Sequence, residues 1–194
     1  MSGRLILNQI EGKSGASNIV TVPTGHKVVG IDTGSVRAPG SVIQVVQGVL
    51  TSAFTCVANG TVTAITGLTA TISPFSTSSR ILVSVSLSHS VTQAGTTYGA
   101  TVRRNGVTNI QLGDSSGSKQ QCNVPLTWAG DGNQHNAFAW SVVDSPGTIS
   151  ATTYGVYVNN DNTGTLFVNR TSTDQDNSTG KRSISTITLF EISG

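Results

Sequence analysis

An aromatic residue followed by a run of polar side chains is the first place in this 194-residue sequence where chemistry is expected. Trp128 precedes Asp131, Asn133 and His135 in the stretch TWAGDGNQH. A flat aromatic face beside carboxylate and amide groups suits a sugar, because the ring stacks on it and the polar groups bind its hydroxyls. These four residues form a candidate glycan site. The alternative is that Trp128 closes the core beneath a solvated loop, the commoner place for a large aromatic residue.

A second stretch, GDSSG at 113–117, is similar to the segment around the nucleophile of trypsin-like proteases. Such a serine needs a histidine base and a buried carboxylate that orients it. His26 lies in a glycine-rich leader, His89 ends an expected strand, and His135 follows the serines, so none has a recognisable catalytic context. We expect a Gly- and Ser-rich loop here, no catalytic residue, and a protein that is not an enzyme.

Metal and cofactor sites are also not expected. Asp161, Asp174 and Asp176 could gather on loops around a cation, but spaced Asx residues in turns are commoner than metal ligands. The two cysteines, Cys56 and Cys122, lie far apart and show no Cys-x-x-Cys or Cys/His spacing of a zinc site. The sequence leaves open whether they form a bridge or remain thiols.

The composition limits the possible partners. Charged residues make up only 10% of the chain, and the net charge of +2 comes from scattered Lys and Arg. Because no basic stripe with interleaved aromatic residues is present, nucleic-acid binding is not expected. No apolar run reaches membrane length and the N-terminus does not read as a signal peptide, so we expect no membrane insertion.

The elements that must position these residues are β-strands. Between 81 and 88, aliphatic residues alternate with mostly small polar ones, the period-two pattern of a strand with one buried face. Turn signals then recur about every ten residues, which is typical of a sandwich. The Asn105-Gly106 pair is the strongest hairpin signal in the chain. Almost no helix is expected. The expected strands are Val42–Val49, Ala53–Val57, Val62–Ile65, Leu68–Ile72, Ile81–His89, Tyr98–Arg103, Thr108–Leu112, Val124–Trp128, Ala137–Val143, Thr152–Val158, Thr165–Asn169 and Ser185–Ile192.

The same alternation predicts the core, and the last strand is expected to be central in its sheet because the chain finishes within it. The predicted core residues are Leu68, Ile72, Ile81, Val83, Val85, Leu87, Val102, Leu126, Phe138, Trp140, Val142, Val156, Leu166, Val168, Ile187 and Leu189.

The first 40 residues differ from the rest, which predicts an N-terminal arm (1–40) ahead of a β-sandwich domain (41–194). Short β-prone runs are cut by glycines and by Pro39-Gly40, and runs of four residues cannot build a core alone. Such runs need copies of themselves or the surface of a partner. The alternative is that they are extra edge strands of the same domain.

Several segments resemble virion surface proteins of tailed bacteriophages, especially cyanophages: capsid decoration (cement) proteins and distal domains of tail fibres or tailspikes. The segments are GRLILNQIEGKSG, SNIVTVPTGHKV, APGSVIQVVQ, LTATISPFSTSSRILVSV, VDSPGTISATTY and STITLFEISG, and their order follows that family. The resemblance implies a jelly-roll-like antiparallel β-sandwich that trimerises on the outside of a particle. It implies no catalytic residue and no cofactor.

From this resemblance we expect a capsid cement protein at the virion surface, made and assembled in the cytoplasm of a bacterial host. Its arm, with Leu5, Ile6, Leu7 and Ile10 foremost, would bind the major capsid protein or another virion protein. The alternative is a host-recognition module of the tail fibre or tailspike type that binds a cell-surface glycan. Head or tail location, and the faces of the trimer, stay open.

Overall fold

The structure is a computed structural model that describes residues 20, 22–30, 32, 36–57, 60–92, 97–127, 134–160, 164–178 and 180–194. The chain divides into two compact units, Met1–Val36 and Arg37–Gly194. In the first unit the described residues form no strand or helix, and His26 N donates a hydrogen bond to Pro23 O at 3.0 Å. Several of its valines are exposed, with Val28 at 68% and Val29 at 63%. The proposed role of residues 1–40 as an arm stays a prediction.

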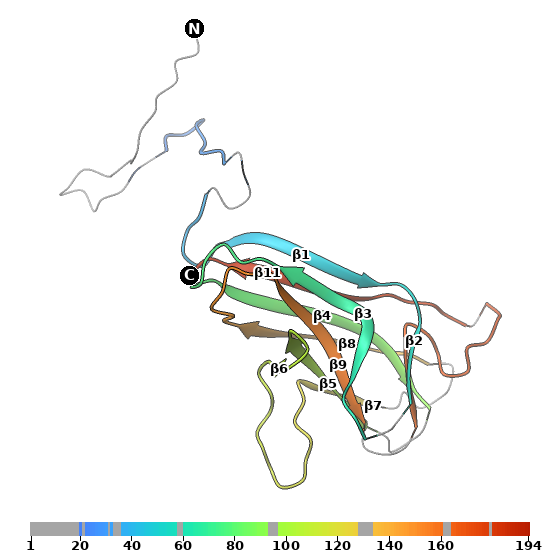
Figure 1. Cartoon of the computed structure of the whole chain (residues 1–194). Helices are drawn as coiled ribbons and strands as arrows, with labels where there is room; N and C mark the ends of the chain where they lie inside the picture. Colours follow the sequence, from blue (N-terminus) through green and yellow to red (C-terminus); the bar gives the residue numbers. More distant parts are fainter. Residues whose placement is uncertain are drawn as a thin grey trace. The chain divides into compact units, whose positions relative to one another are not determined.

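The second unit is a sandwich of two antiparallel sheets (Figure 1). Within the described residues, sheet A contains β1 (Val42–Leu50), β2 (Phe54–Val57), β4 (Arg80–Val91), β8 (Asn136–Asp144), β10 (Thr165–Val168) and β11 (Ser185–Ile192). Sheet B contains β3 (Thr63–Ile72), β5 (Thr97–Arg104), β6 (Thr108–Asn109), β7 (Val124–Thr127) and β9 (Thr152–Asn160). No described residue is helical, so no helix among them is long and apolar enough to cross a membrane.

Sheet A contains two interrupted strands. One consists of β1 followed by β2, and the other consists of β10 followed by β11. In β4, residues 80–86 pair with β11 and residues 89–91 pair with β10 along the same edge. In the same way β1 pairs with β11, and β2 continues along β10. The segment 169–184 therefore interrupts a single strand: the chain leaves the sheet after Val168 and returns to the same edge of β4 at Ser185. We call this segment the 169–184 excursion.

The strand order is that of a jelly roll. With each interrupted strand counted once, the first strand pairs with the last (β1/β2 with β10/β11) and the second with the seventh (β3 with β9). The third pairs with the sixth (β4 with β8) and the fourth with the fifth (β5 with β6 and β7). This nested pairing is a long antiparallel hairpin rolled into two layers. The predicted all-β, jelly-roll-like sandwich is confirmed.

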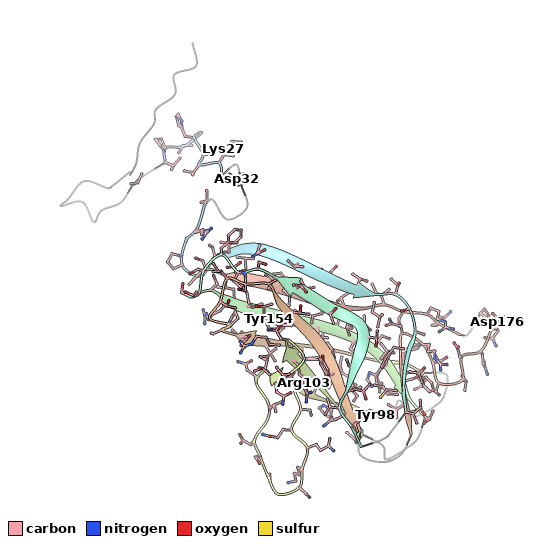
Figure 2. The ribbon with its side chains drawn as sticks, in the orientation of Figure 1. Lys27, Asp32, Tyr98, Arg103, Tyr154 and Asp176 are labelled. Carbon is pink, nitrogen blue, oxygen red and sulfur yellow. The ribbon has the colours of Figure 1, made fainter. Side chains whose placement is uncertain are left out.

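The core lies between the sheets where the alternation predicted it. Of the predicted core residues, all are buried except Phe138 and Trp140, which are half-buried and pack against the cluster. Both lie on β8, which pairs only with β4 and so forms an edge of sheet A. Several large core residues were not predicted, Ile65 among them. Tyr98 and Tyr154, labelled in Figure 2, are fully buried side chains of sheet B.

Two details of the strand prediction are wrong. The two expected strands Val62–Ile65 and Leu68–Ile72 are one strand, β3, with an irregularity between Ala64 and Thr69 where Gly67 has a φ of +87°. Thr108–Leu112 shortens to β6, because Gln111 turns the chain with a φ of +47°.

The hairpin at Asn105-Gly106 is confirmed: both residues have positive φ, as a type I′ turn requires. The last strand, β11, is central as predicted, since it pairs with β1 on one side and β4 on the other.

Candidate functional site

Most of the predicted site residues lie outside the described part of the chain. This holds for Leu5, Ile6, Leu7 and Ile10, and for Trp128, Asp131 and Asn133. His135 is described: it lies just before β8, and its Nδ1 is 3.4 Å from Ser88 Oγ. The glycan site and the arm contact therefore stay predictions, although the structure shows what holds the two ends of the 128–133 loop.

The base of that loop is fixed by side chains that meet at the carbonyl of Thr127. Asn136 Nδ2 donates to Thr127 O at 3.0 Å, and His89 Nε2 lies 3.3 Å from the same oxygen. His89 is fully buried and its ring stacks on Phe138, with 5.5 Å between centroids. Burial lowers the pKa of His89 to about 4. The hydrogen bond to Thr127 acts in the opposite direction, and the nearby His135 lowers the pKa further. The neutral ring thus carries its proton on Nε2 and donates it to Thr127.

This histidine region does not assemble a catalytic relay. Ser88 Oγ accepts a hydrogen bond from Ser183 Oγ at 2.8 Å and lies near His135. Among the described residues, no carboxylate hydrogen-bonds to His89 or His135, so neither is oriented as a general base requires. The Ser115 loop carries no contact to a histidine in the described structure either. In this region the described contacts are those of Ser88 with Ser183 and His135, and of His89 with Thr127.

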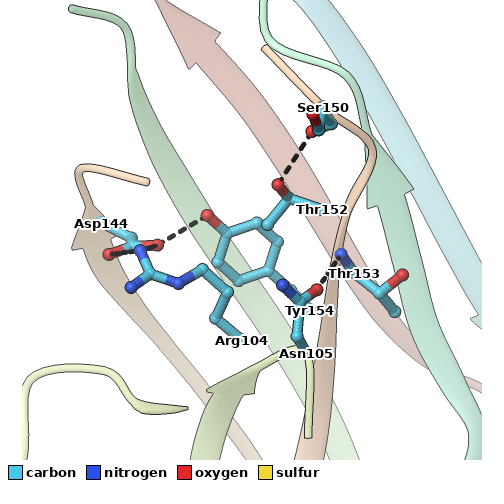
Figure 3. Close-up of polar contacts among 7 residues, drawn as sticks. All are labelled: Arg104, Asn105, Asp144, Ser150, Thr152, Thr153 and Tyr154. Carbon is cyan, nitrogen blue, oxygen red and sulfur yellow. Dashed lines mark hydrogen bonds and ion pairs between the residues drawn. The ribbon is translucent and has the colours of Figure 1, made fainter. Parts of the chain in front are cut away.

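At the opposite end of the sandwich, an ion pair and a phenol join the two sheets (Figure 3). Arg104 Nη1 of sheet B lies 3.0 and 2.8 Å from the two carboxylate oxygens of Asp144 on β8. Tyr154 Oη donates to Asp144 Oδ2 at 2.7 Å. Burial and the neighbouring carboxylate raise the pKa of Tyr154, so the phenol keeps its proton and remains a donor. We call these three residues the sheet lock. Its charge-assisted hydrogen bonds connect sheet B to sheet A.

The outer face of sheet A, across β1, β11, β4 and β8, is a broad surface with one charged residue at its end. Cross-strand register places Val45, Phe190, Leu82 and Val143 in one apolar row across β1, β11, β4 and β8. The next rows are Gln47, Thr188, Ser84 and Ser141, then Val49, Thr186, Ser86 and Ala139. Within these described strand segments, Arg80 at the end of β4 is the one charged residue of the face. We call this surface the sheet A face.

The other end of sheet A is covered by the 169–184 excursion. Arg170 stacks its guanidinium carbon 3.9 Å from the ring centroid of Phe167, on β10. Asp174 then pairs with Arg170 at 3.3 Å and with Arg182 at 2.7 Å. Asp174 is therefore held between two arginines. Asp161, considered with it from the sequence, lies outside the described residues. No group of three metal-binding side chains occurs among the described residues.

Comparison with known proteins finds a likeness to viral capsid proteins in structure only. No family model and no curated protein matches the chain. The chain is similar to a mutant VP2 protein of infectious bursal disease virus in derived T=1 particles, with a TM-score of 0.42 and 15% identity over 86% of this chain and 40% of that one. Two further bursal virus structures, derived T=1 particles and the Gx strain, give TM-scores of 0.41 at 13% identity over 87% of this chain and 41% and 42% of theirs.

This chain spans about two fifths of the length of those chains. The jelly-roll assignment above rests on the strand pairing of this chain itself. Membership of the phage surface-protein family stays a prediction.

Proposed function

We propose that this protein is a structural component of a virion, a trimeric decoration protein whose sandwich faces outward and whose N-terminal arm binds the capsid. The observation that carries the proposal is the sheet A face. An assembly subunit needs a surface that other copies can cover without stranding a charge, because an unpaired buried charge costs several kcal/mol. The sheet A face is uncharged across four strands except for Arg80 at its end.

The size of the face fits such a contact. The face has four rows of side chains: the three rows named above and the row of Ile192 and Arg80. Four strands about 4.8 Å apart, with these rows about 6.7 Å apart, cover roughly 500 Å². In a closed trimer the sheet A face of one copy meets a different surface of the next copy. Such a contact buries about 1,000 Å² counted over both copies, the lower limit for a specific interface. The small hydroxyl side chains Ser84, Ser86 and Thr188 permit close approach, and the Val45–Val143 row supplies apolar contact. The surface therefore suits self-association.

The test is the molar mass of the full chain in solution, measured by light scattering after gel filtration. Ser86→Lys places one charge on β4, an inner strand of the sheet A face, at an exposed position, and we expect it to lower the trimer mass to that of a monomer. Thr71→Lys, at an exposed position on sheet B, is the matched control and should leave the mass unchanged. A monomeric wild-type chain would refute the trimer.

The cement role has its own test. Full-length protein should decorate empty capsids of its virus at fixed stoichiometry, and a chain without residues 1–40 should not. Capsid binding that persists after the deletion would exclude the arm, including Leu5, Ile6, Leu7 and Ile10, as the attachment element.

A host-recognition module that binds a cell-surface glycan is the second candidate. It is favoured by the fixed base of the 128–133 loop, where His89 and Asn136 both bind Thr127 O. Binding to a glycan array that is lost on Trp128→Ala would support it. An array signal that survives this change would remove Trp128, Asp131, Asn133 and His135 as the glycan site.

A further inference from the structure

A groove lies on the outer face of sheet B, where β5 and β9 meet the loop that connects β6 to β7. Its floor is formed by Thr101 and Arg103 of β5 and by Tyr157 and Asn159 of β9. These residues point outward because their neighbours Ala100, Val102, Val156 and Val158 are buried in the core. The volume of the groove is about 220 Å³. Arg103 is labelled in Figure 2.

The loop that walls the groove is anchored to sheet B by Asn123. Its Oδ1 accepts a hydrogen bond from Val102 N at 2.7 Å, and its Nδ2 donates to Ile110 O and Gln111 O at 2.8 and 2.7 Å. Gly113 N also donates to Cys122 O at 3.3 Å, which closes the neck of the loop. The wall is therefore part of the fold, and the groove exists before a ligand arrives.

Arg103 is held in one position by two contacts. Its guanidinium carbon lies 5.1 Å from the ring centroid of Tyr157, and its Nε donates to Asn109 Oδ1 at 2.7 Å. Neither Nη atom has a hydrogen-bond or carboxylate partner among the described residues. A guanidinium fixed by stacking keeps its planar fork of donors ready, which is the geometry that recognises a carboxylate through two parallel hydrogen bonds.

Amide side chains surround this guanidinium. Asn109, Gln120, Gln121 and Asn159 all line the groove. Asn159 Nδ2 donates to Gln120 Oε1, which ties the strand to the loop, and Asn159 Oδ1 has no hydrogen-bond partner in the described structure. Amides both donate and accept hydrogen bonds, so a cluster of them suits a ligand with neighbouring hydroxyl groups.

The groove continues into a second lobe beyond Gln120, which lines both. This lobe has a volume of about 350 Å³ and includes Lys119 and Thr97. Neither lobe is lined by a described Asp or Glu; Asp114, on the same loop, lines neither. Each lobe therefore presents one cation and no anion, and the complementary ligand carries negative charges along its length.

We infer that this groove binds an acidic polysaccharide, with the carboxylate of one uronic acid unit on the Nη atoms of Arg103 and its hydroxyls on the surrounding amides. The next unit lies past Gln120 with its carboxylate near Lys119. The first lobe is smaller than sites for drug-sized ligands, which start near 300 Å³, and so suits a single sugar ring. A lone phosphate would leave the amides without partners. The site is separate from the Trp128 loop, and it does not depend on the cement role.

The experiment is calorimetric titration of the full chain with oligogalacturonate and with oligomannuronate, each beside its methyl ester. We expect saturable binding of at least one free acid, and no saturable binding of the ester. Arg103→Gln should weaken binding at least about tenfold, because the bidentate contact is lost. Lys181→Gln, which removes an exposed cation that lines neither lobe, is the matched control and should bind as the wild type does.

Other outcomes would overturn the assignment. The carboxylate site would be refuted if neither free acid bound saturably, or if acid and ester bound equally well. If inorganic phosphate competed for the groove as strongly as the oligosaccharide does, the groove would be an anion site and not a sugar site. Thermal unfolding of each variant confirms that it is folded, and Arg103→Lys serves as a second variant that keeps the charge but loses the fork. Equal affinity of the wild type, Arg103→Gln and Arg103→Lys would refute the role of Arg103.

Discussion

Ser185 Oγ donates a hydrogen bond of 2.7 Å to Asn169 Oδ1, and both residues are fully buried. They stand at the two ends of the 169–184 excursion, where the β10–β11 strand line is broken. Asn169 Nδ2 also donates to Leu50 O at 2.8 Å and to Ser52 O at 3.0 Å, in the segment where β1 gives way to β2. Both interrupted strands of sheet A, β1/β2 and β10/β11, lose backbone hydrogen bonds at this point. The Asn169 side chain replaces them with its own hydrogen bonds.

Replacing Asn169 should destabilise the sandwich more than an average substitution. Asn169→Ala removes three side-chain hydrogen bonds and leaves buried polar groups without partners, at about 1 kcal/mol each. Alanine also fits poorly at the φ of +61° that asparagine tolerates here. We expect a loss of about 3 kcal/mol in the free energy of unfolding, measured by urea titration. Asn169→Gly relieves the backbone strain alone and should recover only a part. Full recovery by glycine would mean that the hydrogen bonds contribute nothing.

The sheet lock should show coupling between its members. Tyr154→Phe removes one hydrogen bond to Asp144, whose side chain is 11% exposed, and should cost about 1 kcal/mol. Asp144→Asn weakens the contact to Arg104 as well and should cost about 2 kcal/mol. Because both changes weaken or remove the same Tyr154–Asp144 bond, the double variant should lose less than the two single losses together. Chemical denaturation of all four proteins measures this, and strict additivity would show that the phenol and the carboxylate act independently.

Acid should destabilise the protein through His89. The folded pKa of about 4 lies below the value of 6.5 in the unfolded chain, so the unfolded state binds the proton more readily. The stability contributed by neutral His89 is complete above pH 6.5 and is lost as the pH falls towards 4. The loss approaches about 3 kcal/mol. Unfolding titrations of the wild type and His89→Gln between pH 4 and 7 should diverge in slope. His26→Gln is the control, and equal slopes for the wild type and His89→Gln would exclude His89 as the cause.

The fold could be predicted from the sequence because aliphatic residues alternate with mostly small polar residues in the central strands. Ile81, Val83, Val85 and Leu87 are each 1% exposed or less, as their spacing indicated. The alternation of residues could not predict the order of the strands within each sheet. Phe138 and Trp140 alternate equally well, but pairing places β8 at an edge and leaves them half-buried. Alternation reports which face is buried, whereas exposure also depends on whether a neighbour lies on each side.

The polar sites escaped prediction for a related reason. Arg103 and Tyr157 are far apart in the sequence and meet only because β5 and β9 are neighbours in register. Asn169 looked like the last residue of a strand, and its role depends on a 16-residue excursion that no local pattern reveals. The predicted glycan site relied on residues adjacent in the sequence, of which only His135 falls within the described chain.

The two cysteines should behave as free thiols of unequal access. Cys56 is buried on β2 and Cys122 is partly buried beside β7, and burial raises the pKa of each thiol. Less thiolate is then present at neutral pH, so both should react slowly with a disulfide reagent, Cys122 before Cys56. Cys122→Ser should remove the faster phase and Cys56→Ser the slower one. Denatured, unreduced protein should give two thiols per chain; none would indicate a bridge.

The sandwich should keep its stability without the first unit. Its core cluster lies wholly within the second unit, and residues 37–41 are tied to the body: Gly40 N donates to Ser193 O at 2.8 Å, and Ser193 N donates to Ser41 O at 2.9 Å. Arg37 also stacks 4.6 Å from the ring centroid of Phe75. A chain that starts at residue 37 should therefore unfold at the wild-type temperature in calorimetry.

A chain that starts at residue 42 is the informative comparison. It loses the two backbone hydrogen bonds to Ser193 and the Arg37 contact, which together contribute about 2 kcal/mol. That loss should lower the midpoint by several degrees. If the shorter deletion alone produced the full drop, residues 1–36 would be part of the folded body, and their proposed use as an arm free to bind a capsid would have to be abandoned.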